Sequence, residues 1–115
     1  MTRILFVFLV FAAFACEKDY CDVECDTALI PTAKFQHSRF QCDNGTFQCV
    51  QFQNVSENIN GGTKYNWTFG DGEGSDEENP NHSYPQYGEF NVVLKVTNCN
   101  GTVSFYTEKI NISIN

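Results

Sequence analysis

The sequence is poor in basic residues and in histidine. It contains 7 lysines and arginines against 14 aspartates and glutamates, 2 histidines, and a net charge of −7. A phosphate backbone is bound by a surplus of Lys and Arg, so this composition argues against nucleic acid as a partner. The acidic residues are scattered, apart from the run SDEE at 75–78, and this distribution is typical of a solvated face that keeps a protein soluble.

Long apolar runs are lacking beyond the N-terminal end of the chain. Residues 1–15, MTRILFVFLVFAAFA, carry one positive charge at Arg3 and then an apolar run from Ile4 to Ala15. This run is shorter than a membrane-spanning helix and ends in small residues, which is the pattern of an export signal. We therefore expect residues 1–15 to be a signal peptide and the mature chain to begin at Cys16, in oxidising conditions.

Helical periodicity and internal repeats are absent as well. Residues 16–33 are polar, acidic and aperiodic, and we interpret them as a Cys-containing tether. From Lys34 onward the chain consists of short alternating runs separated by turn residues, as in FQCVQFQNV at 47–55 and EFNVVLKVT at 89–97. About seven strands of this kind over residues 34–115 predict an all-β domain of two antiparallel sheets packed face to face.

The last of these runs, TVSFYTEKINISI at 102–114, changes its apolar phase. Val103 and Phe105 fall on one alternation, whereas Ile110, Ile112 and Ile114 fall on the other. A strand whose inward face changes in this way needs one extra residue, so the sequence predicts a β-bulge between the two groups.

Residues suited to catalysis do not form a recognisable set. His37 lies on an edge-like run where we expect it to be solvated, and no Ser, Cys or carboxylate pair is spaced for nucleophilic or acid–base chemistry. The triplet Gly70-Asp71-Gly72 lacks the Lys-Ser/Thr of a phosphate loop and the Ser of a nucleophile elbow. The carboxylates at 71, 73 and 76–78 match no calcium loop. We therefore expect no enzyme activity, no metal site and no cofactor.

Three blocks in a fixed order carry a family resemblance. They read YNWTFGDG at 65–72, NPNHSY at 79–84 and YGEFNVVLKVTN at 87–98. They resemble the pattern of the PKD domain, which is Trp-Asp-Phe-Gly-Asp-Gly, then Asn-Pro-x-His-x-Tyr, then Gly-x-Tyr-x-Val-x-Leu-x-Val. Thr68 stands where this family usually has Asp, and Phe90 stands where it usually has Tyr, which removes a hydroxyl that ties the strand to a neighbouring turn.

The resemblance implies an immunoglobulin-like β-sandwich over residues 34–115, with Trp67 and Phe69 facing the core. It also implies that the Gly-Asp-Gly triplet turns the chain, since Gly adopts positive φ freely and Asp accepts backbone N–H bonds inside turns. His82 is then expected to pack and to hydrogen-bond rather than to catalyse. The structural motif implied in this way comprises Trp67, Phe69, Gly70, Asp71, Gly72, Pro80, His82, Tyr84, Gly88 and Phe90.

All six cysteines follow the signal segment. Cys42 and Cys49 flank an Asn-Gly turn at one end of the expected sandwich, and Cys99 lies in a turn at the other end. Because a disulfide requires Cα atoms within about 7 Å, we expect a Cys42–Cys49 bond and a bond from Cys99 to Cys25 or Cys21 in the tether.

The stretch around Cys16 resembles a bacterial lipoprotein signal, in which the cysteine after small residues is acylated. Glu17-Lys18-Asp19 behind it resembles the export tag of Bacteroidetes-type surface lipoproteins. This second resemblance implies a lipid anchor on Cys16 and a place at the outer membrane or cell surface. The alternative is ordinary cleavage after Ala15, which leaves Cys16 for a disulfide and pairs all six cysteines.

Two classes of function follow from these observations. The first is a non-enzymatic, lipid-anchored module that binds a protein or a glycan at the cell surface or serves as a spacer there. The second is a secreted, disulfide-stapled soluble protein, such as an inhibitor or a calcium-binding accessory. No residue names the ligand, and the fold alone does not name it either.

Overall fold

The computed structural model of the chain describes residues 25–114, so the expected signal peptide, Cys16 and Cys21 lie outside it. Within this range the chain forms seven strands in two antiparallel sheets and no helix, which confirms the predicted fold class. None of these residues forms a helix of the length and hydropathy needed to cross a membrane.

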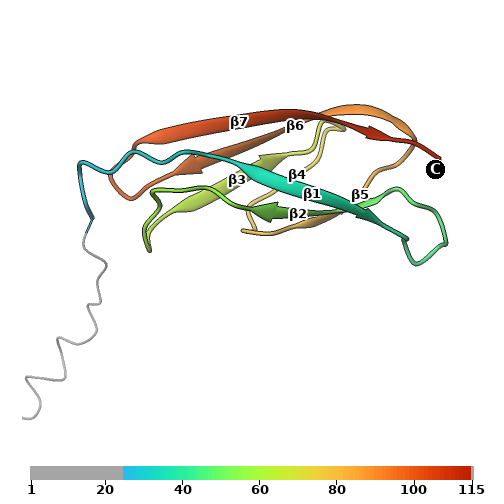
Figure 1. The fold of residues 1–115 in the computed structure, drawn as a ribbon, viewed down its shortest axis with the longest axis horizontal. Helices are drawn as coiled ribbons and strands as arrows, with labels where there is room; N and C mark the ends of the chain where they lie inside the picture. The colour runs from blue at the N-terminus through green and yellow to red at the C-terminus, as the bar shows by residue number, and fades with distance from the viewer. Residues whose placement is uncertain (1–24, 115) are drawn as a thin grey trace, which may run out of the picture.

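The chain passes from one sheet to the other three times, after the second, fourth and fifth strands (Figure 1). The three-stranded sheet has the order β1-β2-β5 and consists of Phe35–Phe40, Cys49–Asn54 and Asn81–Ser83. The four-stranded sheet has the order β4-β3-β6-β7 and consists of Gly74–Ser75, Lys64–Thr68, Gly88–Thr97 and Val103–Ile112. Strands β6 and β7 are the longest, with ten residues each, and they pair over their whole length.

The core lies between the sheets and is dominated by aromatic rings. Phe35 of β1, Phe52 of β2 and Trp67 of β3 meet with ring centroids 5.1–5.7 Å apart. These contacts bury the alternating apolar faces that the sequence predicts for β2, β3 and β6. The other buried members are Ala33, Val50, Phe69, Tyr84, Val92, Leu94, Val96, Ile110 and Ile112.

The predicted bulge in the last strand is wrong. Pairing of β6 with β7 runs without a break from Gly88 opposite Ile112 to Thr97 opposite Val103. Val103 and Phe105 therefore point out of the sandwich, and Ile114 beyond the strand is also exposed. The inward positions of this half of β7 are taken by Ser104, which accepts a hydrogen bond from Ala33, and by Tyr106, which packs against the core beside Phe35. The same alternation of inward and outward side chains therefore continues along the whole strand.

The described part of the expected tether, residues 25–33, is packed on the sandwich. The backbones of Thr32 and Glu57 exchange hydrogen bonds of 3.0 and 2.9 Å, and the Ala33 N–H donates to Ser104 Oγ at 3.0 Å. Ala33 itself is buried in the core. The segment thus supplies a buried residue to the core and a hydrogen-bond donor to Ser104 of β7. The folded unit therefore begins before Lys34.

Two disulfides lie at opposite ends of the sandwich. The structure joins Cys42 to Cys49 across the loop between β1 and β2, and it joins Cys25 to Cys99 in the turn between β6 and β7. This loop and this turn lie at opposite ends of the ribbon (Figure 1). Of the two tether cysteines considered for Cys99, the structure uses Cys25.

Candidate functional site

The Gly-Asp-Gly turn follows directly on β3 and is fixed by close packing. Gly70 has φ +90° and Gly72 has φ +93°, a region that residues with a side chain rarely adopt. At Gly70 a Cβ atom would lie 2.7 Å from the carbonyl oxygen of Asn91, so glycine is required there for space as well as for conformation. The backbone N–H of Phe69 donates to Glu73 O at 3.0 Å and closes the turn.

Asp71 uses both of its carboxylate oxygens inside the protein. Oδ1 accepts the Glu73 N–H at 3.1 Å, and Oδ2 lies 2.7 Å from Nε2 of His82. The side chains of Asp71 and His82 are only 5% and 8% exposed. The His82 ring is stacked on Phe69, with centroids 4.1 Å apart, and meets Tyr84 edge-on from the other direction. A His–Asp pair can act as a general base, but here the ring is covered and the pair joins the Gly-Asp-Gly turn to β5.

Tyr84 completes this cluster. Its hydroxyl donates to Phe69 O at 2.9 Å, and its ring stacks on Phe90 with a centroid separation of 4.4 Å. Burial, reinforced by the negative charge of Asp71, raises the pKa of the Tyr84 phenol well above its ordinary value. The phenol therefore stays neutral, and its O–H remains available as the hydrogen-bond donor to the Phe69 carbonyl oxygen. Tyr84 thus links its own loop to the Gly-Asp-Gly turn, while Phe90 supplies only ring contact.

The remaining residues of the implied motif are also structural. Pro80 is fully buried, and its carbonyl oxygen accepts the Phe52 N–H at 2.9 Å. Gly88 opens β6 with φ +149°. Trp67 is 3% exposed, and its indole N–H donates to Glu77 O at 2.8 Å. No pattern in the sequence indicates this last contact, which anchors the acidic loop through its backbone while the carboxylates at 73 and 76–78 face solvent. Within residues 25–114, no three His, Cys, Asp or Glu side chains form a group that could hold a metal ion.

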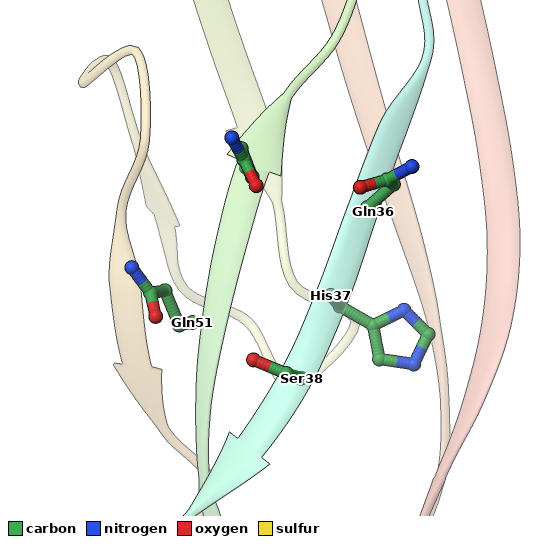
Figure 2. Close-up of a pocket in the computed structure, with 5 residues that line it drawn as sticks. Gln36, His37, Ser38 and Gln51 are labelled. Atoms are coloured by element: carbon green, nitrogen blue, oxygen red, sulfur yellow. The ribbon is translucent and has the colours of Figure 1, made fainter.

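A polar face covers the outside of the three-stranded sheet. Gln36 lies opposite Gln53, and Ser38 lies opposite Gln51, so that amide and hydroxyl groups stand side by side (Figure 2). The hollow between them has a volume of about 110 Å³, well below the roughly 300 Å³ at which ligand pockets begin. His37 lies beside it, but its ring is half-buried near Glu108 of β7, with Nδ1 3.6 Å from Oε2, rather than solvated as the sequence predicts.

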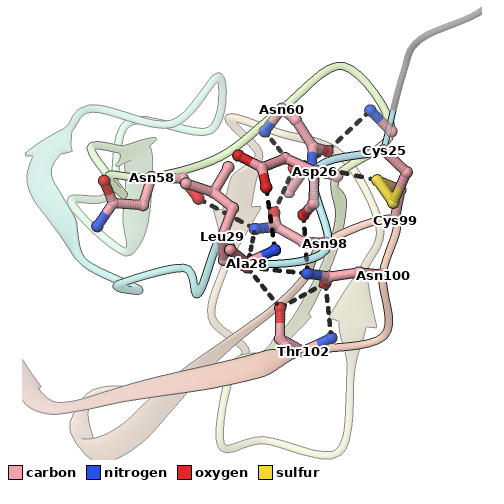
Figure 3. The surroundings of a disulfide bond; sticks show 12 residues. Cys25, Asp26, Ala28, Leu29, Asn58, Asn60, Asn98, Cys99, Asn100 and Thr102 are labelled. Carbon is pink, nitrogen blue, oxygen red and sulfur yellow. Dashed lines mark hydrogen bonds between the residues drawn. A yellow bond between two sulfur atoms is a disulfide. The ribbon is translucent and has the colours of Figure 1, made fainter.

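The end of the sandwich that holds Cys25–Cys99 is a hydrogen-bonded anchor for the N-terminal segment (Figure 3). Asn100 Nδ2 donates to the carbonyl oxygens of Asp26 and Leu29, both at 3.0 Å, and Thr102 Oγ1 donates to Leu29 O at 3.0 Å. Asn98 is 2% exposed, and its Nδ2 donates to Asn58 O at 3.0 Å in the loop between β2 and β3. Sequence reasoning missed Asn98, although a polar residue at the end of an apolar alternating run was a usable signal.

The opposite end of the sandwich exposes aromatic rings, and we call it the distal end. Phe40, Phe47 and Tyr87 are 39%, 46% and 40% exposed. Phe40 ends β1, Phe47 lies in the loop closed by Cys42–Cys49, and Tyr87 precedes the start of β6, which pairs with the last residues of β7. Sequence reasoning did not single out these three residues, because they lie in separate segments that only the fold brings to one end.

The loop from Cys42 to Cys49, which we call the distal loop, is held by several hydrogen bonds despite its exposure. Arg39 Nε donates to Phe47 O at 3.1 Å, and its guanidinium also donates to Ser113 beyond β7. Inside the loop, Cys42 N–H donates to Thr46 O at 2.7 Å, and Asn44 Oδ1 accepts from the Thr46 N–H at 3.0 Å. A loop fixed in this way loses little conformational entropy when a partner binds.

Comparison with known proteins gives one consistent result. The model of the PKD domain family matches residues 30–114 of this chain. The PKD1 domain of Vibrio anguillarum Epp superposes with a TM-score of 0.63 at 25% identity, over 80% of this chain and 100% of that domain. The PKD1 domain of the Vibrio cholerae metalloprotease PrtV superposes with a TM-score of 0.64 at 29% identity, over 74% of this chain and 99% of that domain.

A curated relative, the collagenase ColA of Clostridium perfringens, is 44% identical over 48 residues. These residues are 42% of this chain but only 4% of the collagenase. The similarity therefore concerns one module of a much longer enzyme.

Proposed function

The chain belongs to the PKD domain family, and on that premise we propose that it is a non-enzymatic binding module, exported and held at the cell surface by lipid on Cys16. In this proposal the distal end contacts a protein or a glycan. Domains of this family are generally non-catalytic accessory modules. The internal use of Asp71 and His82 supports the same view, since neither side chain has a free face toward solvent.

The observation that carries the proposal is the distal end itself. Three aromatic rings are about two-fifths exposed at this end, and the loop that carries Phe47 is held in place by a disulfide and by the Arg39 hydrogen bonds. Exposed rings on preorganised loops are typical of binding surfaces, because Phe and Tyr bury large areas at a low cost in side-chain entropy. The amides of Gln41 and Asn44 also hold this loop, through Gly45 O at 3.1 Å and the Thr46 N–H at 3.0 Å.

The position of the N-terminal segment supports a distal end that points away from the membrane. Residues 25–33 dock at the end that holds Cys25–Cys99, and the distal end faces the other way (Figure 1). A lipid on Cys16, nine positions before Cys25, would place the distal aromatic residues on the side away from the membrane. The signal that ends at Ala15, the cysteine after it and Glu17-Lys18-Asp19 are the reasons to propose this lipid.

The anchor is tested by partitioning of the exported protein between detergent and water. We expect the wild type in the detergent phase and Cys16→Ser in the aqueous phase with an unchanged melting temperature. Several buried acyl chains hold a protein firmly, at about 0.8 kcal/mol for each CH₂. A wild type found in water, with Cys16 bonded to Cys21, would overturn the anchor and favour the secreted alternative, in which all six cysteines pair.

The binding role is tested with a glycan array and a panel of cell-surface proteins. We expect Phe47→Ser with Tyr87→Ser to abolish a signal that the wild type gives. The matched control is Ile30→Ser, which removes an apolar side chain that is 64% exposed in the docked segment. Equal loss in the control would point to general stickiness, and full binding by the double variant would reject the distal end as the contact surface.

A further inference from the structure

The outer face of the four-stranded sheet differs in character from the rest of the molecule. Two adjacent rows of its register place Lys64 beside Thr97 and Val103, and Asn66 beside Lys95 and Phe105. We call these six residues the Lys–Phe face. It belongs to the other sheet from the polar face of β1 and β2 and lies apart from the distal aromatic residues, so none of the observations above accounts for it.

Charge on the Lys–Phe face opposes the charge of the whole chain. The protein carries a net charge of −7, yet these two rows hold two lysines and no carboxylate. Among the described residues, neither Lys64 nor Lys95 has a carboxylate oxygen within 4.0 Å, whereas Lys109 farther along the same face lies 3.8 Å from Glu89. Asp76 lines a hollow together with Lys64 and Asn66, so an acidic residue lies at this border of the face.

Phe105 gives this face its second unusual property. Its ring is 62% exposed, the Val103 side chain beside it is 40% exposed, and Lys95 stands directly opposite on β6. The hollow on the polar face of the other sheet is lined by amides, a hydroxyl and His37, with no Phe, Tyr or Trp side chain. A large ring beside Lys95, with Lys64 in the adjacent row on β3, is therefore a local feature of this surface in an acidic protein.

We propose that the Lys–Phe face binds an anionic polysaccharide. A sugar ring stacks on Phe105, its carboxylate or sulfate groups lie against Lys95 and Lys64, and Asn66 and Thr97 hydrogen-bond to hydroxyls. An acidic peptide fits less well, because extended peptides bind at a free sheet edge or in a groove, and these rows lie on the flat side of paired strands. Sugar rings need neither, since they combine an apolar face with polar edges.

The test is affinity electrophoresis of the full chain in detergent through gels that contain polygalacturonate, dextran sulfate or neutral dextran. We expect one of the anionic polymers, and not dextran, to retard the wild type, and the two arms distinguish carboxylate from sulfate. Lys95→Gln and Phe105→Ser should each weaken this retention about tenfold, as expected for the loss of one charge-assisted contact or one stacked ring. Because these side chains are exposed, the melting temperature should stay unchanged.

Two controls keep the result specific. Lys109→Gln removes the same charge from the same face but at the lysine that Glu89 accompanies, and Thr107→Ser alters the position after Phe105 on that face. Both should bind as the wild type does. The proposal is overturned if neither anionic polymer retards the wild type, if Lys109→Gln weakens retention as much as Lys95→Gln, or if polyglutamate binds equally well and Phe105→Ser has no effect. Failure of the distal-end variants leaves this outcome unchanged, since they share no residue with it.

Discussion

The two ends of the sandwich are cross-linked by disulfides of very different span. Cys25–Cys99 joins residues 74 positions apart and fixes the N-terminal segment on the β6–β7 turn. Cys42–Cys49 joins residues 7 positions apart and closes a single loop. A disulfide stabilises mainly by restricting the unfolded chain, and this effect grows with the length of the closed loop. The comparison suggests that the first bond serves global stability and the second serves the shape of the distal loop.

The largest expected effect is the loss of the long-range bond. Cys25→Ser with Cys99→Ser should lower the free energy of unfolding by about 4.5 kcal/mol, from the loop-closure entropy of its span. The comparison is urea unfolding of this variant and the wild type. Hydrogen exchange at Thr32 and Ala33 should accelerate as the segment detaches. A smaller loss than that of the short-range variant below would contradict the division between the two ends.

The short-range bond is expected to matter less for stability. Cys42→Ser with Cys49→Ser should cost about 2.5 kcal/mol by the same relation, because Arg39 and the turn hydrogen bonds remain. The same urea experiment gives this value. A binding signal that depends on Phe47 should be largely lost even under conditions where the double variant is still folded. If binding is intact in a folded double variant, the bond does not organise the contact surface.

Tyr84 lies between the two ends, and its contribution to the free energy of unfolding should depend on pH. Tyr84→Phe removes the bond to Phe69 O and should cost about 1–2 kcal/mol near neutral pH. The raised pKa means that the neutral phenol is favoured in the folded state. Its contribution is therefore present below the ordinary Tyr pKa of 10.0 and is lost as pH rises through and beyond that value.

The measurement is urea unfolding at about pH 8 and about pH 11, on either side of the ordinary Tyr pKa. The loss of stability at the higher pH should be smaller in Tyr84→Phe than in the wild type. Part of the loss should persist, since the pKa values of Tyr65 and Tyr106 are also raised, the first by burial and the second by the Glu108 carboxylate. An identical slope in both proteins would contradict the assignment to Tyr84.

The smallest effect is expected at Asp71. Asp71→Asn keeps an oxygen for the Glu73 N–H and changes only the contact to His82, so the cost should be about 1 kcal/mol. Calcium should leave the melting temperature of the wild type unchanged. A calcium-dependent rise that disappears in Asp71→Asn would make Asp71 a metal ligand, since a ligand that binds the native state stabilises it by mass action.

The strands that bury one complete apolar face were predictable from sequence. Val50 and Phe52, or Val92, Leu94 and Val96, alternate without interruption, and the structure buries them all. The phase of β7 was not predictable, because its inward positions include Ser104, whose hydroxyl accepts the Ala33 N–H from 71 positions away. A local pattern contains no record of such a contact.

The surfaces were less predictable than the motif for the same reason. The roles of Asp71 and His82 followed from a family resemblance with the residues in fixed order. The distal aromatic residues come from three separate segments, and the Lys–Phe face is assembled from β3, β6 and β7. These surfaces depend on sheet register and on which side of a strand each residue takes, and both are set by long-range pairing.

The Cys25–Cys99 bond also determines how mechanical force passes through the domain. Tension on the chain before Cys25 crosses the disulfide directly into the β6–β7 turn and bypasses residues 26–33 and β1. From there it acts on β6 and β7, the two ten-residue strands that this turn joins and that pair over their whole length. The covalent link therefore protects β1, whose partner strand β2 is also short, from being peeled away when the N-terminal end is pulled.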